Sequence, residues 1–269
     1  MKGSIAEGAG AFRLLTARSN GPRSPCTIPD RALGCPWLYT NSLTDLKERV
    51  RRRLYHSPRG QRFITNAFHR LYYYLSERTW TQTSWMGVPT RKLPLDVWIY
   101  QEIIAELQPS LIVETGTRFG GSALFFAHLC DLLGHGSVVT IDIDADAQPE
   151  HSRVTYLVGS STDPAIVDQV CEMLPAEGHV LVVLDSDHRQ RHVAAEIAAY
   201  ADMVTVGSYL IVEDSNVGGN PVHNQEVPDA GPMGAIRDFL ASDGRFAADR
   251  SREKFFFTFN PSGYLRRAR

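Results

Sequence analysis

Long apolar runs are missing from this chain of 269 residues. No stretch approaches the roughly 18 consecutive apolar residues that a transmembrane helix needs. The first residues, MKGSIAEGAG, lack the apolar segment of a secretory signal. Because 43% of the residues are apolar, enough for a real core, we expect a soluble cytoplasmic protein without membrane insertion.

Cysteine pairs and an excess of one charge are missing as well. The four cysteines, Cys26, Cys35, Cys130 and Cys171, are widely spaced, and no CxxC or Cys/His zinc spacing occurs. The net charge is only -2, which argues against a general nucleic-acid binder. These absences leave a globular protein that acts on, or binds, small molecules.

The N-terminal part differs in composition from the rest. Residues 1–40 are rich in Gly, Ser, Pro and Arg and predict a flexible arm. Residues 41–93 contain two helical patterns and predict a cap or an oligomerisation segment, which favours a homo-oligomer. The first helix carries RVRRR, which predicts either a solvated face or a surface for an anionic partner.

Residues 94–269 alternate between helical and strand patterns. The strands are nearly continuous apolar runs, which is typical of a parallel sheet covered on both faces. We predict an α/β fold, a Rossmann-like doubly wound sheet of seven strands. The strands are expected over residues 111–115, 137–143, 153–159, 179–185, 207–214, 253–260 and 263–267.

The last two predicted strands, EKFFFTFN and GYLRR, flank the tight turn NPSG. This pattern predicts a hairpin, so the final strand runs antiparallel to its neighbour. A parallel sheet closed by a terminal hairpin is the layout of S-adenosylmethionine (SAM) methyltransferases rather than of dinucleotide-binding enzymes.

A glycine turn follows the first predicted strand, in VETGTRFGGS. Gly116 permits close approach of the backbone to a ligand, and the spacing GxxxGG differs from the GxGxxG of nicotinamide enzymes. Glu114 could receive the ammonium group of methionine, directly or through water. Thr117 and Ser122 flank the same turn and are further candidates for cofactor binding; the alternative is a plain structural turn.

Polar residues also end the second and third predicted strands. Asp142 lies about 26 residues after Gly116, where a carboxylate can accept hydrogen bonds from ribose hydroxyls. Ser160 and Ser161 could border the adenine ring. Consecutive strands that end in polar residues at one sheet edge predict a ligand crevice.

Several carboxylates end the fourth and fifth strands, in LVVLDSDH and LIVED. Asp185, Glu213 and Asp214 would repel one another unless a cation lay between them, and carboxylate oxygens suit Mg²⁺. We predict these three as metal ligands, with Asp185 also bordering the cofactor. His188 is a candidate general base or a supporting residue, and Asp187 could instead cap the following helix.

A metal at this position would explain methyl transfer to an alcohol. The metal would lower the pKa of an acceptor hydroxyl and fix its direction, and His188 could take the proton. Asp185 and His188 are therefore the predicted catalytic residues.

Five motifs in order, from TSWMGVPTRKLPLDVWIYQEII to EKFFFTFNPSGYLRR, resemble the cephalosporin hydroxylase and rhamnosyl O-methyltransferase family over roughly residues 80–269. The resemblance implies a SAM- and Mg²⁺-dependent O-methyltransferase. It assigns Glu114, Gly116 and Asp142 to SAM, and the carboxylate trio to the metal. The family pattern often has histidine where this chain has Asn220, so substrate contacts of the loop 215–230, a candidate lid, are not carried over.

Two other aromatic residues invite less specific interpretations. Trp85 is expected in the core, with pocket lining as the alternative, and His223 is expected to be exposed.

The leading hypothesis is methylation of a sugar hydroxyl, such as that of a rhamnosyl group, on a natural product or glycolipid. Alternatives are a catechol or polyketide phenol as acceptor, a nucleotide-dependent oxidoreductase, and a non-catalytic partner in antibiotic tailoring.

Overall fold

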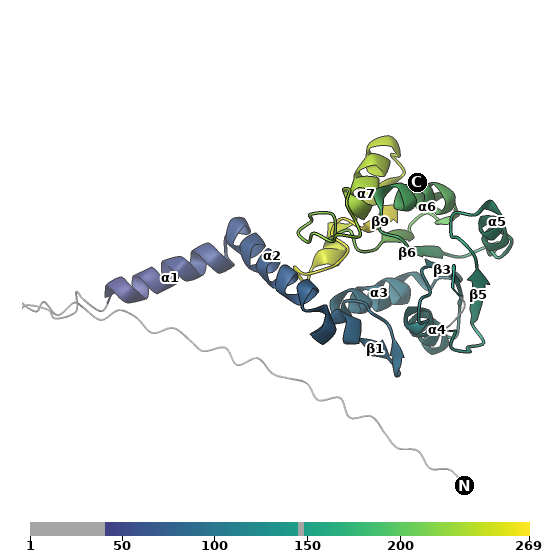
Figure 1. Cartoon of the computed structure of the whole chain (residues 1–269), viewed down its shortest axis with the longest axis horizontal. Coiled ribbons are helices and arrows are strands. Elements are labelled where there is room, and N and C mark those ends of the chain that lie inside the picture. Colours follow the sequence, from purple (N-terminus) through teal and green to yellow (C-terminus); the bar gives the residue numbers. More distant parts are fainter. Residues whose placement is uncertain (1–40, 145–147) are drawn as a thin grey trace, which may run out of the picture. The chain divides into compact units, whose positions relative to one another are not determined.

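A computed structural model describes residues 41–144 and 148–269 of the chain (Figure 1). The chain divides into two compact units, Met1–Glu48 and Arg49–Arg269. The predicted arm, residues 1–40, lies outside the described residues. The second unit carries all of the elements discussed below except the first residues of helix α1.

The described elements follow the predicted alternation from residue 94 onward. The helices are α1 (Asn41–Tyr55), α2 (Pro58–Tyr74), α3 (Pro94–Leu107), α4 (Gly121–Leu133), α5 (Pro164–Glu172), α6 (Gln190–Tyr200) and α7 (Gly231–Ser242). The strands are β1 (Ser84–Trp85), β2 (Val88–Pro89), β3 (Leu111–Thr115), β4 (Ser137–Asp142), β5 (Val154–Val158), β6 (Val180–Leu184), β7 (Tyr209–Val212), β8 (Phe246–Ala248) and β9 (Tyr264–Arg267). Short 3₁₀ helices span Ser76–Arg78, Trp80–Gln82, Ala201–Met203 and Arg250–Glu253.

One mixed sheet forms the centre of the second unit. Its strand order is β5-β4-β3-β6-β7-β9-β8. Strands β3 to β7 pair in parallel, whereas β9 pairs antiparallel to both β7 and β8. This arrangement confirms the predicted fold class. From β3 the chain adds β4 and β5 on one side of the sheet, and from β6 on it adds strands on the other side. A crevice therefore opens between the carboxyl ends of β3 and β6, where α/β proteins bind ligands.

Helices cover both faces of this sheet (Figure 1). On one face Ile103 of α3 and Phe126 of α4 pack in a buried cluster with Ile112 and Val183. On the other face α5, α6 and α7 cover alternate residues of the same strands. Because the central strands are buried on both faces, their sequences are apolar without alternation.

The strand predicted over residues 253–260 is wrong. Strand β8 instead lies at Phe246–Ala248, and irregular chain separates it from β9. Phe257 and Phe259 pack with His69 and Tyr72 of α2, and the Phe259 N–H donates to Asp96 rather than to a neighbouring strand. Aromatic packing against α2 therefore overrides the β propensity of FFFTF.

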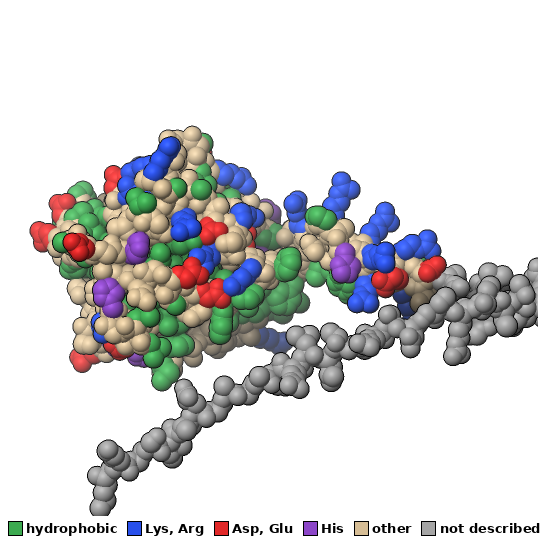
Figure 2. Space-filling model, turned by 180° about the vertical axis from the view of Figure 1, so that it is seen from behind, with side chains coloured by type: hydrophobic (Ala, Val, Ile, Leu, Met, Phe, Trp, Pro, Cys, Tyr) green, Lys and Arg blue, Asp and Glu red, His purple; other side chains and the backbone are tan. Residues whose placement is uncertain are grey.

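Exposed apolar residues mark α2. Phe63 and Leu71 of this helix are 69% and 57% exposed. The helix instead buries other residues, among them His69, against the rest of the second unit. Basic side chains gather along α1 (Figure 2).

Among the described residues, no helix has the length and apolar character needed to cross a membrane. The homo-oligomer stays a prediction.

Candidate active site

The turn after β3 requires glycine. Gly116 has a φ of +89°, and a Cβ there would lie 2.0 Å from the carbonyl oxygen of Asp185. The turn therefore packs directly on the end of β6, and it leads into α4 through Gly120, which is also left-handed. The backbone of this turn faces the crevice between β3 and β6.

Glu114 is buried beneath this turn. Its Oε2 accepts a hydrogen bond from Thr140 Oγ1 at 2.8 Å, and Thr117 Oγ1 donates in turn to Thr140, at 2.7 Å. Burial raises the pKa of Glu114 to about 7, against the lowering effect of Lys92. Its Oε1 is buried without a hydrogen-bond partner among the described residues. Glu114 is fully buried and lines neither of the two cavities described below, so its contact with the cofactor stays a prediction.

The ends of β4 and β5 form a cleft of about 570 Å³. Asp142, Ser160 and Ser161 line it together with Gly116 and Asp185. Asp142 Oδ2 accepts from the backbone N–H of Arg118 at 2.7 Å. The structure thus brings together the predicted cofactor residues of three strands, while their role in binding stays a prediction.

His192 of α6 also lines this cleft, and Glu196 lies buried beneath it. Glu196 is buried and accepts from Ser161 Oγ and Ser186 Oγ, each at 2.6 Å. The hydrogen bond with Glu196 raises the pKa of His192, against burial. These residues lie one and two helical turns from Arg189, and no motif in the sequence marked them as part of a site.

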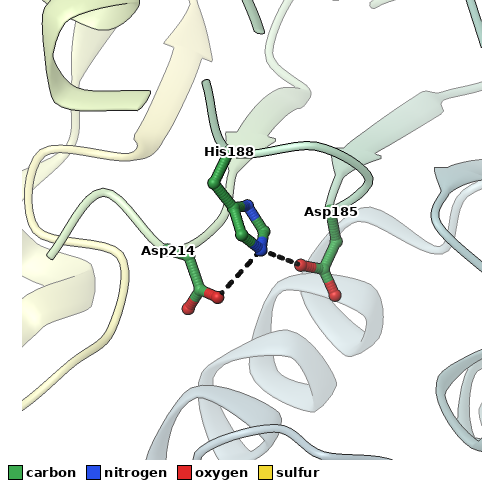
Figure 3. A group of neighbouring side chains, drawn as sticks. All are labelled: Asp185, His188 and Asp214. Carbon is green, nitrogen blue, oxygen red and sulfur yellow. Dashed lines mark ion pairs between the residues drawn. The ribbon is translucent and has the colours of Figure 1, made fainter. Parts of the chain in front are cut away.

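His188 lies between Asp185 and Asp214 (Figure 3). Its Nε2 is 3.2 Å from Asp214 Oδ2 and 4.0 Å from Asp185 Oδ1. One ligand atom from each residue lies within 4.8 Å of the others, close enough to share a metal ion. The two carboxylates fit a hard divalent cation that keeps several water ligands, and the imidazole of His188 lies beside that position.

Burial shapes the charge of this group. It raises the pKa of Asp214, whereas the neighbouring His188 lowers it. Asp214 also has a positive φ of 50°, and its N–H donates to Asn260 Oδ1. A carboxylate held in this uncommon conformation at a crevice is typical of a functional position.

Glu213 has a different partner. Lys92 Nζ donates to Glu213 Oε1 and to Asp185 Oδ2, both at 2.6 Å, and the Lys92 side chain is only 3% exposed. Burial alone would lower the pKa of Lys92, but the Asp185 and Glu213 carboxylates raise it above its ordinary value. The ligand atoms that lie together belong to Asp185, His188 and Asp214. Glu213 is held by a lysine that the sequence did not single out, and its role as a metal ligand stays a prediction.

Asp187 faces away from this group and binds Arg189. Its Oδ1 accepts from the Arg189 backbone N–H at 3.0 Å and its carboxylate forms an ion pair with the guanidinium. Those hydrogen bonds lower the pKa of Asp187 to about 2. Asp187 does not cap α6 as the alternative predicted, because it accepts from Arg189, which precedes the helix, while the N–H of Gln190 donates to Asp229.

A second cavity, of about 720 Å³, adjoins Asp185, His188 and Asp214. Tyr73 and Trp80, stacked with ring centroids 5.5 Å apart, form one wall. Burial, and then Asp214, raises the pKa of Tyr73 to about 12, which keeps its hydroxyl protonated. An aromatic wall opposite carboxylates suits an acceptor with an apolar face and hydroxyl groups.

The loop 215–230 closes the cavity from another side. Asn224 Nδ2 donates to Tyr73 Oη at 3.1 Å, and Asn224 lines the cavity, whereas Asn220 is hydrogen-bonded within its own loop. His223 is exposed, as predicted. Trp85 packs edge-on against Phe125 and donates to His128 Nδ1, and it is partly buried at the margin of the core. Movement of the loop as a lid stays a prediction.

Comparison with known proteins identifies the family. The family described as Rhamnosyl O-methyltransferase/CmcI matches residues 77–268. The chain belongs to this family. Membership confirms the predicted family and the class of enzyme, an O-methyltransferase.

Curated relatives and solved structures agree with this assignment. The rhamnosyl O-methyltransferase of Mycobacterium bovis BCG is 39% identical over 214 residues, covering 75% of this chain and 84% of that protein. The Mycobacterium leprae relative of the same name is 39% identical over 209 residues, covering 75% and 90%. A CmcI structure with Mg and SAM superposes with a TM-score of 0.53 at 23% identity, covering 70% of this chain and 77% of that one. An apo-structure of CmcI has a TM-score of 0.54 at 24% identity, with the same coverage. These structures share the fold.

Proposed function

We propose that this protein is a SAM- and Mg²⁺-dependent O-methyltransferase that methylates a sugar hydroxyl, such as one of a rhamnosyl group on a natural product or glycolipid. The observation that carries the proposal is the juxtaposition of Asp185, His188 and Asp214 with a large cavity that has an aromatic wall. The names of the curated relatives support the choice of a rhamnosyl acceptor.

The cofactor would occupy the cleft at β4 and β5. Asp142 would accept hydrogen bonds from the ribose hydroxyls, and Ser160 and Ser161 would border the adenine, because all three line this cleft. Glu114, with its unpartnered Oε1, would receive the methionine ammonium. Gly116 would let the cofactor approach the backbone beside Asp185, and Thr117 and Ser122 line the adjoining cavity.

The acceptor would bind between the aromatic wall and the carboxylates. Asp185 Oδ1 and Asp214 would hold Mg²⁺, while Lys92 keeps Asp185 Oδ2 occupied. Mg²⁺ bound there would act as a Lewis acid that lowers the pKa of the acceptor hydroxyl. His188 would take the hydroxyl proton while the acceptor oxygen attacks the methyl group of SAM, and S-adenosylhomocysteine would be the leaving product. Tyr73 and Trp80 orient the sugar by packing on its apolar face.

The test is methyl transfer to matched acceptors. Purified full-length protein with SAM and Mg²⁺ is incubated with 4-nitrophenyl rhamnoside, 4-nitrophenyl glucoside or catechol, and methylated products are measured by mass spectrometry. We expect methylation of the rhamnoside above the glucoside. Methylation of catechol alone would support the phenol alternative, and no methylation of any acceptor would contradict the sugar assignment.

A further inference from the structure

Two arginine side chains converge on one aromatic ring beside the proposed cofactor site. The guanidinium carbon of Arg91 lies 4.8 Å from the centroid of Phe119, and that of Arg118 lies 5.3 Å from the same centroid. Both arginines line the larger cavity, and Arg118 also lines the smaller cleft. The pair therefore lies where the proposed cofactor and acceptor sites join.

Neither guanidinium has a carboxylate partner among the described residues that form ion pairs. Arg91 Nε is moreover buried without any hydrogen-bond partner. Burial, and then the like charge of Arg118, lowers the pKa of Arg91. Two cations held together with an unmet buried donor are unfavourable unless an anion joins them.

The backbone at both positions is also unusual. Arg91 has a φ of 54° and Arg118 a φ of 46°, a region that few non-glycine residues adopt. The preceding Pro89 and Thr90 pack on Gly121, where a Cβ would lie 2.4 Å from the Pro89 carbonyl oxygen. Arg118 is held by the hydrogen bond from its N–H to Asp142. Two residues with uncommon backbone conformations therefore place a partly buried and an exposed arginine against the same ring, just before α4.

The other charged residues of the cavity have roles of their own. Asp187 pairs with Arg189, and Asp185 and Asp214 contact Lys92 and His188. Glu226 also lines the cavity and is exposed. The pair Arg91 and Arg118 is thus the positive counterpart to a cavity that is otherwise rich in carboxylates.

We infer that Arg91 and Arg118 form a subsite that binds a carboxylate. The inference deepens the proposed function and rests on it. A planar guanidinium binds a carboxylate through paired hydrogen bonds. The carboxylate could belong to the methionine end of SAM, with Glu114 Oε1 facing the ammonium of the same zwitterion, or to an acidic acceptor.

Calorimetric titration of the full-length protein distinguishes these sources. S-adenosylhomocysteine carries the amino-acid carboxylate, whereas 5′-methylthioadenosine has the same nucleoside and thioether without it. If the cofactor supplies the carboxylate, Arg91→Met and Arg118→Met weaken S-adenosylhomocysteine binding by about tenfold or more. Binding of 5′-methylthioadenosine stays unchanged. Arg237→Met, an exposed arginine on α7, is the matched control and alters neither.

A second arm tests the acceptor. If S-adenosylhomocysteine binding is unchanged in the variants, KM is compared for 4-carboxyphenyl rhamnoside and the neutral 4-nitrophenyl rhamnoside. A rise in KM for the acidic acceptor alone assigns the subsite to the acceptor. Unchanged binding and KM, or equal losses for both nucleosides, would overturn the subsite. If the wild-type protein binds neither nucleoside, the proposed cofactor role itself fails, and the inference fails with it.

Discussion

The two halves of the sheet edge use different means to prepare for a ligand. At β4 and β5, one carboxylate, Asp142, is partly exposed and is held by backbone N–H groups. At β6 and β7, the partly buried Asp185 and Asp214 and the buried Glu213 are brought together with Lys92 and His188. The first half can recognise a neutral nucleoside by shape and hydrogen bonds, whereas the second concentrates charge that needs compensation.

The largest effect is expected where a compensating charge is removed. Lys92→Met would leave Asp185 and Glu213 buried without their cation, and breaking such a pair costs about 3–5 kcal/mol of unfolding free energy. Denaturant unfolding measures this loss. Lys254→Met removes the more exposed pair with Glu102 and should cost less than about 1 kcal/mol.

A double variant separates charge from packing at this position. Lys92→Met combined with Glu213→Gln removes one of the two unpaired carboxylates, so it should recover part of the lost stability. Equal stability of Lys92→Met and the wild-type protein would show that the buried ion pairs do not hold this half of the edge together.

Asp214→Asn should remove activity while it preserves the fold. Asparagine tolerates the positive φ at this position, but it is a neutral and weaker ligand for a hard cation. We expect turnover to fall by about 100-fold or more. Substitution of a residue that only supports a metal ligand typically costs about 10- to 100-fold, and loss of a direct ligand should cost at least as much. Asp202→Asn, far more exposed, is the control. Normal turnover in Asp214→Asn would remove this residue from the mechanism.

The half of the sheet edge at β6 and β7, where the charges gather, also depends on a histidine that stays neutral. His69 of α2 is buried and accepts from Asn216 Nδ2 at 2.8 Å, and burial, then Arg70, lowers the pKa of His69 to about 4. As pH falls from 6.5 to 4, His69 therefore takes up a proton in the unfolded chain before it does so in the folded protein. Stability from this group, fully present above pH 6.5, decreases by about 2 kcal/mol between pH 7 and pH 5.

His69→Gln tests this linkage by difference. Glu114 and Asp96 have raised pKa values, about 7 and about 6, so they act with the opposite sign in an overlapping range. Only the difference between wild-type and variant stability curves isolates His69. That difference should change steadily between pH 6.5 and pH 4, and parallel curves would contradict a neutral buried histidine.

The half of the sheet edge at β4 and β5 should respond least to substitution. Asp142→Asn keeps one oxygen for the Arg118 N–H but loses the charge that accepts from ribose. We expect about tenfold weaker S-adenosylhomocysteine binding and little change in stability, as measured by calorimetry and thermal unfolding. A loss of stability comparable to that of Lys92→Met would remove the contrast between the two halves.

The sequence predicted the sheet edge well because strand ends are local features. Asp142, Asp185 and Asp214 each follow an apolar run, and parallel pairing brings such ends to one edge. Lys92 could not be found in this way, because TRKLPLD precedes a helix and nothing local shows that its ammonium is buried. Likewise, FFFTF has the composition of a strand, and only the aromatic residues of α2 decide its place.

Calorimetric titration of Mg²⁺ into the full-length protein with S-adenosylhomocysteine, together with turnover in EDTA, tests the central claim most directly. We predict one Mg²⁺ site per chain, lost in Asp214→Asn, and turnover that EDTA abolishes and Mg²⁺ restores. Full turnover in EDTA, or Mg²⁺ binding unchanged in Asp214→Asn, would contradict the claim that these strand ends hold a catalytic cation.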